Sequence, residues 1–120
     1  MDNSISRYDL LAKMLDVGNL RHQVIAQNVA NVNTPGYHRL EVSFEDAFVR
    51  QMQRAGPQQP AALAIAPQIV EGGGPERVDG NNVDIDAEMG RLTKNSLLMN
   101  AFTQILASRI TAQRAAIAGR

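Results

Sequence analysis

The residue types best suited to chemistry gather in an acidic, amide-rich run about two thirds of the way along the chain. The run carries oxygen ligands of the kind that Ca²⁺ prefers, at Asp79, Asn81, Asp84, Asp86 and Glu88. A calcium-binding EF-hand loop that began at Asp79 would need Gly at its sixth position and Glu at its twelfth, where this chain has Asp84 and Gly90. The pattern therefore predicts a turn followed by a helix cap, and no calcium site.

No other arrangement of reactive residues matches a catalytic or metal-binding pattern. The two histidines, His22 and His38, lack a second ligand at the spacing of a zinc motif, and the chain has no cysteine. The run Gly72–Gly74 lacks the Lys and Ser or Thr of a phosphate-binding loop, and no serine lies in a Gly-x-Ser-x-Gly elbow. The sequence therefore predicts a protein that is not an enzyme, with no metal, cofactor or small-molecule substrate.

Composition narrows the class of protein further. The 120 residues carry 12 Lys and Arg against 12 Asp and Glu, and the signs balance within each half, which excludes the basic footprint of a nucleic-acid-binding protein. The longest apolar run, residues 61–66, is far too short to cross a bilayer. Asp2 stands where a cleavable secretion signal has positive charge. We therefore expect a cytoplasmic protein, or one exported by a route that needs no cleavable signal.

A long amphipathic helix is predicted over residues 1–33. Apolar residues recur there every three or four positions, which is typical of a helix that packs along a coiled-coil-like seam. The predicted seam comprises Tyr8, Leu11, Leu15, Ile25, Val29 and Val32. Pro35 disfavours helical geometry in Thr34, so the helix should end there, and Pro35 with Gly36 suits the centre of a type II turn.

The middle segment, residues 34–83, should form a small, loop-rich cap. A short helix is predicted at about 44–54, with Ser43 and Asp46 at the positions of a capping box. Prolines and glycines concentrate in residues 56–75, which predicts a mobile or extended loop that is not packed and tolerates deletion. The run 78–83 suits a tight hairpin turn at Asp-Gly or Asn-Asn.

A second long helix is predicted over residues 84–120, with Asp84 or Asp86 as its cap and Gly119 as its stop. Its predicted seam comprises Ile85, Leu92, Met99, Leu106, Ile110 and Ile117, with Met89 on the same spacing. The predicted fold class is mainly α, in which the two terminal helices pair antiparallel, like a coiled coil. Because two helices alone bury little surface, their outward apolar flanks should pack against neighbouring chains.

Two asparagines, Asn28 and Asn31, lie three residues apart beside the first seam. Their amides can finish the helix by satisfying its terminal backbone groups. A buried asparagine in a helical seam can also fix the register of the packing, so the same amides can instead bind neighbouring subunits. The residues leave both interpretations open.

The end of the first helix carries a family signature. The run AQNVANVNTPGY, residues 26–37, closely resembles the A-x-N-[IV]-A-N-x-x-T-P-G-Y pattern shared by bacterial flagellar rod and hook proteins. The matching motif positions are Asn28, Ala30, Asn31, Thr34, Pro35, Gly36 and Tyr37. A second run resembles that of the proximal rod proteins, through Asp79, Gly80, Asn81, Val83, Asp84, Glu88 and Met89, followed by Leu92 and Asn95. The short length favours one of the two short proximal rod proteins, with the other as the alternative.

The resemblance implies a structural subunit of the proximal rod of the bacterial flagellar basal body, which transmits torque and is needed for motility. It also implies export, unfolded and without a cleavable signal peptide, through the flagellar type III apparatus, followed by self-association into a helical assembly in the periplasm. The implied partners are other rod subunits and the inner-membrane ring and rod adaptor proteins. The alternative from another class is a small cytoplasmic helical-hairpin adaptor that binds a partner helix.

Overall fold

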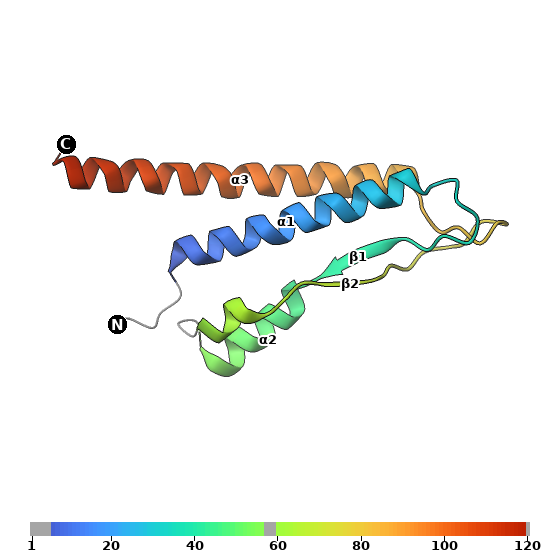
Figure 1. The fold of residues 1–120 in the computed structure, drawn as a ribbon, viewed down its shortest axis with the longest axis horizontal. Helices are drawn as coiled ribbons and strands as arrows, with labels where there is room; N and C mark the ends of the chain where they lie inside the picture. Colours follow the sequence, from blue (N-terminus) through green and yellow to red (C-terminus); the bar gives the residue numbers. More distant parts are fainter. Residues whose placement is uncertain (1–5, 57–59, 120) are drawn as a thin grey trace.

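The computed structural model describes residues 6–56 and 60–119, which form an elongated, mainly helical molecule (Figure 1). Its elements in chain order are helix α1 (Arg7–Ala30), strand β1 (Leu40–Ser43), helix α2 (Glu45–Ala55), the 3-10 helix η1 (Pro60–Ala64), strand β2 (Gln68–Glu71) and helix α3 (Ile85–Ala118). The molecule is 64 Å long but only 14 Å deep along its shortest axis, because the elements lie side by side in one layer. Much of each element therefore remains uncovered.

Helix α1 lies between α3 on one side and the β1–β2 hairpin with α2 on the other (Figure 1). Hydrogen bonds of 3.0, 2.9 and 3.1 Å join α1 and α3, between Tyr8 and Gln113, Gly18 and Asn95, and Asn28 and Glu88. As the residue number increases along α1, the number of the α3 residue that it meets decreases. The prediction of a mainly helical fold, with long terminal helices packed together and a small hairpin between them, is confirmed.

The inward face of α3 differs from the predicted seam. The six predicted seam residues of α1 are buried or half-buried, and so are Leu92, Met99 and Leu106 of α3. The structure places the other predicted residues of α3 on its exposed surface, namely Ile85, Met89, Ile110 and Ile117. Two polar residues, Glu88 and Asn95, share the packed side of α3 with Leu92, Met99 and Leu106. Ile85 and Met89 lie beside this packed side, and Ile117 lies beyond Gln113, which meets Tyr8 near the start of α1.

The apolar core lies between α1 and the middle segment. Its buried cluster comprises Val17, Val24, Val42, Phe44, Phe48 and Ala62. Phe44 and Phe48 stack with their ring centroids 5.3 Å apart, an arrangement that aromatic pairs favour. One face of α1 therefore packs on this cluster while another packs on α3.

Residues 60–75 are more ordered than their composition predicts, and residues 57–59 of the predicted loop lie outside the described residues. Residues 60–64 form η1, in which Ala62 is fully buried, and residues 68–71 form β2. Strand β2 pairs antiparallel with β1, with Leu40 opposite Glu71 and Ser43 opposite Gln68. The predicted unpacked loop is therefore wrong for these residues, because partners far away in the sequence hold them in place.

The hairpin also lies away from its predicted position at residues 78–83. Those residues form a tight turn, in which Gly80 has a φ of +82° and its N–H donates a 2.9 Å hydrogen bond to the carbonyl of Arg77. Within the described residues no strand flanks this turn. The hairpin is instead formed by β1 and β2, which α2 and η1 separate in the chain.

Helix α1 ends at Ala30, earlier than predicted, because Asn31 caps it. The side-chain amide of Asn31 donates a 2.8 Å hydrogen bond to the carbonyl of Gln27, one of the groups that a helix end leaves without a partner. The turn at Pro35 and Gly36 follows, and Gly36 has the positive φ, +72°, that a type II turn requires.

Of the predictions for the ends of the other helices, those for α3 agree with the structure and the one for the start of α2 does not. Asp84 caps α3 by accepting from two backbone N–H groups, and Gly119 ends it in the left-handed conformation, so both predictions are confirmed. The capping box predicted at Ser43 is wrong. Phe44 is the N-cap of α2 and makes no side-chain capping bond, because a phenyl ring has no hydrogen-bond acceptor, and the ring packs in the core cluster instead.

Gly18 provides a test of the contact between the long helices. A Cβ atom at this position would lie 2.8 Å from Cγ of Met99, whereas one at Gly90 would meet nothing within 4 Å. We expect Gly18→Val to lower the free energy of unfolding by about 1–3 kcal/mol through overpacking. Gly90→Val should leave it unchanged or slightly raised, because glycine is itself unfavourable inside a helix. Urea unfolding followed by circular dichroism measures both, and equal effects would contradict the close contact.

Candidate functional site

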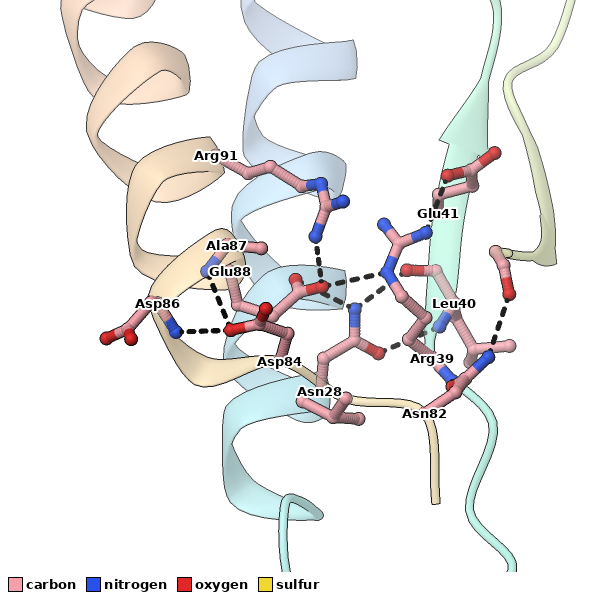
Figure 2. Close-up of polar contacts among 12 residues, drawn as sticks. Asn28, Arg39, Leu40, Glu41, Asn82, Asp84, Asp86, Ala87, Glu88 and Arg91 are labelled. Atoms are coloured by element: carbon pink, nitrogen blue, oxygen red, sulfur yellow. Dashed lines mark hydrogen bonds and ion pairs between the residues drawn. The ribbon is translucent and has the colours of Figure 1, made fainter. Parts of the chain in front are cut away.

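The side-chain amide of Asn28 lies at the centre of a buried polar network that joins α1, β1 and α3 (Figure 2). Its oxygen accepts hydrogen bonds from the backbone N–H of Leu40 at 2.9 Å and from the hydroxyl of Tyr37 at 3.1 Å. Its nitrogen donates to the carbonyl of Leu40 at 2.8 Å and to Glu88 at 3.1 Å. All four hydrogen-bonding positions of the amide are therefore used within the chain. With the backbone of Leu40 the amide makes two hydrogen bonds, one as donor and one as acceptor, as a paired strand does.

Glu88, in the first turn of α3, is fully buried and is the acceptor on which the network converges. Its Oε1 accepts from Nε of Arg39 at 2.8 Å and from the guanidinium of Arg91 at 2.7 Å, while its Oε2 accepts from Asn28. The guanidinium of Arg39 also pairs with Glu41 at 2.9 Å. A buried carboxylate is costly unless it is paired and hydrogen-bonded, and this set of partners meets both conditions.

The network shifts the pKa values of two of its groups. Burial alone would lower the pKa of Arg39, but hydrogen bonds and ion pairs with Glu88 and Glu41 outweigh burial and raise it. Burial, and then the negative charge of Glu88, raises the pKa of the Tyr37 hydroxyl. Arg39 therefore stays cationic and Tyr37 stays neutral near pH 7, so both remain hydrogen-bond donors.

Asn81 holds the second turn against the end of α1. Its side-chain nitrogen donates to the backbone carbonyls of Asn31 at 2.9 Å and Thr34 at 2.8 Å. Its side-chain oxygen accepts from the backbone N–H of Val83 at 2.7 Å. Asn81 is fully buried, so these bonds replace the water that would otherwise satisfy its amide.

Asn82 and Gly36 add further links between the two halves of the chain. The side-chain oxygen of Asn82 accepts from the backbone N–H of Arg39 at 2.6 Å, and its nitrogen donates to the carbonyl of Gly72 at 3.1 Å (Figure 2). The N–H of Gly36 donates to the carbonyl of Asp79 at 2.8 Å. The turn after α1 and the turn before α3 are thus bound to each other directly.

The structure brings the two predicted motifs, about fifty residues apart in sequence, into one junction. Its hydrogen-bonded members from the predicted set are Asn28, Asn31, Thr34, Gly36, Tyr37, Asp79, Asn81, Val83 and Glu88. Asp84 caps α3 beside the junction, and Gly80 closes the turn. The structure leaves the remaining predicted residues exposed, namely Ala30, Pro35 and Met89. The motifs therefore mark a structural joint between the long helices and the middle segment.

The two asparagines of the first motif have different roles. Asn31 finishes the helix, as one interpretation expected. Asn28 fits neither interpretation, because its buried amide is bonded fully within the chain and has nothing left to offer a neighbouring subunit. It sets the position of β1 and of α3 relative to α1.

Three residues of the joint are absent from the predicted set, namely Arg39, Asn82 and Arg91. Arg91 lies three residues after Glu88, a spacing at which side chains meet on one helix face. Asn95 ends the second predicted run but was not placed in the seam, although it lies seven residues after Glu88, the spacing of a heptad. Arg39 and Asn82 meet their partners across long connections and carry no local signal.

The joint is arranged to hold segments together and leaves no free group for chemistry. Among the residues that the structure describes, the one buried side-chain polar atom without a hydrogen-bond partner is Nε of Arg109, which lies outside the joint. In the same part of the chain, no group of three or more His, Cys, Asp or Glu residues could hold a metal ion. No described helix is long and apolar enough to cross a membrane.

Two motifs hold the long terminal helices and the middle segment together, and comparison with known proteins identifies the class of protein that carries them. The family model "Flagella basal body rod protein" matches residues 20–38, which include the end of α1 and the turn after it. The protein FlgB of Borrelia hermsii is 36% identical over 82% of this chain and 86% of its own length. FlgB of Escherichia coli K12 is 30% identical, over 75% and 77% respectively. The chain belongs to the FlgB family of flagellar basal body rod proteins, and it is a structural subunit of the proximal rod.

A third relative shows how far this similarity extends. The flagellar basal-body rod protein FlgG of Caulobacter vibrioides is 38% identical over 46% of this chain but only 21% of its own length. The shared part is thus a small fraction of that larger protein, whereas the FlgB relatives match over most of both chains.

Replacement of Asn28 tests the centre of the joint. Asn28→Asp keeps the shape of the side chain but removes both donors and brings a second carboxylate within 3.1 Å of Glu88. We expect the free energy of unfolding to fall by about 3 kcal/mol, as when a buried charge loses its compensation. Asn33→Asp, which makes the same charge change at an exposed position, should cost less than about 0.5 kcal/mol. If urea unfolding gave equal losses, the joint would not depend on Asn28.

Tyr37 gives the joint a dependence on pH. Its pKa in the folded chain is raised above the ordinary value of 10.0, so its contribution is complete below about pH 10 and is lost as pH rises through the folded value. We expect the stability of the chain to decline at strongly alkaline pH, and Tyr37→Phe to decline less steeply. Unfolding curves of both chains from pH 8 to pH 11 measure the difference, and parallel declines would refute it.

Proposed function

We propose that the chain builds the rod by packing its two terminal helices against the helices of other rod subunits. The observation that carries this proposal is the unequal burial of α3. One side of the helix packs on α1, yet large apolar side chains remain exposed along it at Ile85, Met89, Leu97, Leu98, Ile105, Ile110 and Ile117. Exposed apolar surface of this extent on one element is typical of a protein interaction site.

The helix pair is proposed to be antiparallel and coiled-coil-like. The order of its contacts supports this arrangement, since Tyr8 near the start of α1 meets Gln113 near the end of α3. The seven-residue steps from Glu88 to Asn95 and on to the half-buried Phe102 support a coiled-coil-like seam. In this proposal residues 1–33 and 84–120 form the axial helices, and residues 34–83 form the small segment between them.

The proposed partners are other rod subunits, further copies of the chain in a helical assembly, and the inner-membrane ring and rod adaptor proteins. Membership of the FlgB family supports them, together with the similarity to a second rod protein, FlgG. The proposed route is the flagellar type III export apparatus, without a cleavable signal peptide, and the proposed location is the periplasmic rod. We propose no catalytic role, cofactor, metal, small-molecule substrate or nucleic acid.

The joint around Glu88 supports a role in carrying torque. Arg39, next to β1, and Asn28, on α1, donate charge-assisted hydrogen bonds to Glu88 at the start of α3, and Asn28 accepts a neutral hydrogen bond from the backbone N–H of Leu40. Charge-assisted hydrogen bonds are roughly twice as strong as neutral ones. In this proposal a load applied to one of these three elements passes to the other two, and the middle segment does not rotate relative to the helix pair.

Leu97 provides a test of the proposed assembly. Its side chain is 65% exposed, so Leu97→Asp should change the free energy of unfolding of the isolated chain by less than about 0.5 kcal/mol. In a strain without its own copy of the gene, the same variant should fail to enter basal bodies and should not restore swimming, because a charge would face a packed apolar surface.

Leu97→Met is the matched control, since it keeps the apolar surface and should assemble as the parent does. Deletion of residues 1–33 should abolish both assembly and swimming. Normal basal bodies with Leu97→Asp would show that the outer side of α3 contacts no other subunit. Normal basal bodies without the chain itself would refute the proposed function as a whole.

A further inference from the structure

Opposite charges separate along residues 71–120. Residues 71–88 carry six acidic residues and one basic residue, whereas residues 89–120 carry five basic residues and no acidic residue. Arg91 and Lys94 lie in the first third of α3, so the charges at its two ends are Asp84 and Asp86 at the start and Arg109 and Arg114 near the end. These two ends lie far apart, because α3 runs most of the length of the molecule (Figure 1).

The basic end carries two exposed isoleucines and an exposed arginine on one side of the helix. Ile110, Arg114 and Ile117 are spaced four and three residues apart, so they lie on one side of α3. Ile117 is 81% exposed, because α3 continues past Gln113, which meets Tyr8 near the start of α1 (Figure 1). We name Ile110, Arg114 and Ile117 the tail stripe.

The acidic end of α3 offers a complementary surface. Asp84 caps the helix and Asp86 is exposed in its first turn. Ile85 and Met89, one turn apart, are both about half exposed beside these carboxylates. The two ends of α3 thus carry the same kind of apolar pair with charges of opposite sign.

We propose that the tail stripe binds the acid-capped helix start of an adjacent rod subunit, a surface of the kind that this chain itself presents at Asp84–Met89. This inference rests on the proposed function. The two isoleucines would pack on the exposed aliphatic side chains of that helix start, while Arg114 would face its carboxylates. A contact between unlike ends is heterologous, and repeated around an axis it generates an open helical assembly instead of a closed dimer.

An anionic membrane surface fits the basic end less well than a protein does. Recognition of anionic lipids usually uses clusters of about four to eight Lys and Arg residues. The described part of α3 beyond residue 100 carries only Arg109 and Arg114. Isoleucines confined to one side of a helix are instead typical of packing on another helix.

The test is site-specific photo-cross-linking in cells. A benzophenone amino acid replaces Ile117 in the full chain, expressed in a strain without its own copy of the gene. Basal bodies are isolated after illumination, and the cross-linked peptide is identified by mass spectrometry. We expect capture of another rod chain within one turn of a helix start that carries at least two carboxylates. A second probe at Ile110 serves if the first variant does not assemble.

A probe at Leu97 is the control, because Leu97 lies far from the tail stripe on the same helix, and it should capture a different peptide. Cross-links from Ile117 to a lipid, to residues 1–5 of the same chain or to the middle of a helix would overturn the inference. So would basal bodies that contain the chain without any cross-link from either tail probe. Absence of the parent chain from basal bodies would instead refute the proposed function, and this inference with it.

Charge reversal gives an independent readout. Arg114→Glu should lower incorporation into basal bodies about fivefold or more, because attraction at the contact becomes repulsion. Lys94→Glu makes the same change at an exposed position in the middle of α3 and should leave incorporation unchanged. Circular dichroism establishes that both variants keep their helices. Equal incorporation of the two variants would overturn the inference.

Discussion

The structure depends on the burial of one carboxylate, that of Glu88. Taking this charge out of water is costly, and the cost is offset only because two guanidinium groups and the amide of Asn28 converge on it. Each of these partners comes from a different place, since Asn28 is on α1, Arg39 precedes β1 and Arg91 is on α3. The carboxylate is compensated only when the three elements are correctly placed together, so it specifies their arrangement as well as adding stability.

Apart from the joint around Glu88, few contacts hold the middle segment to the long helices. The apolar cluster around Phe44 is small, and the chain is arranged in a single layer. A single layer cannot enclose α3, so this helix meets α1 through a partly polar seam and exposes apolar side chains elsewhere. These are the properties of a subunit whose packing is completed by other chains. They agree with a rod protein, in which stiffness arises from many subunits packed together.

Several features were accessible from the sequence, and the failures have identifiable causes. On α1 the predicted seam is buried or half-buried, but of the five buried residues it includes only Ile25, and Val17, Gly18, Val24 and Asn28 lie outside it. On α3 the packed side also includes Glu88 and Asn95, which a search for apolar spacing passes over. Strand β2 has four residues and is held by β1, almost thirty residues earlier, so composition alone suggested an unpacked loop. Local patterns cannot report a partner that is distant in the chain.

The sequence by itself determined the class of fold, the positions of the helices, the turn at Gly36 and the family. These depend on local rules, namely helical periodicity, helix caps, the geometry of glycine and proline, and short motifs. Only the tertiary structure decided why the two motifs accompany each other. Asn28 lies 60 residues before its partner Glu88, and Asn81 lies 50 residues after the carbonyl of Asn31 that it binds. These groups become partners only when α1 and α3 lie together. Burial makes their pairing obligatory, and burial is a property of the folded chain as a whole.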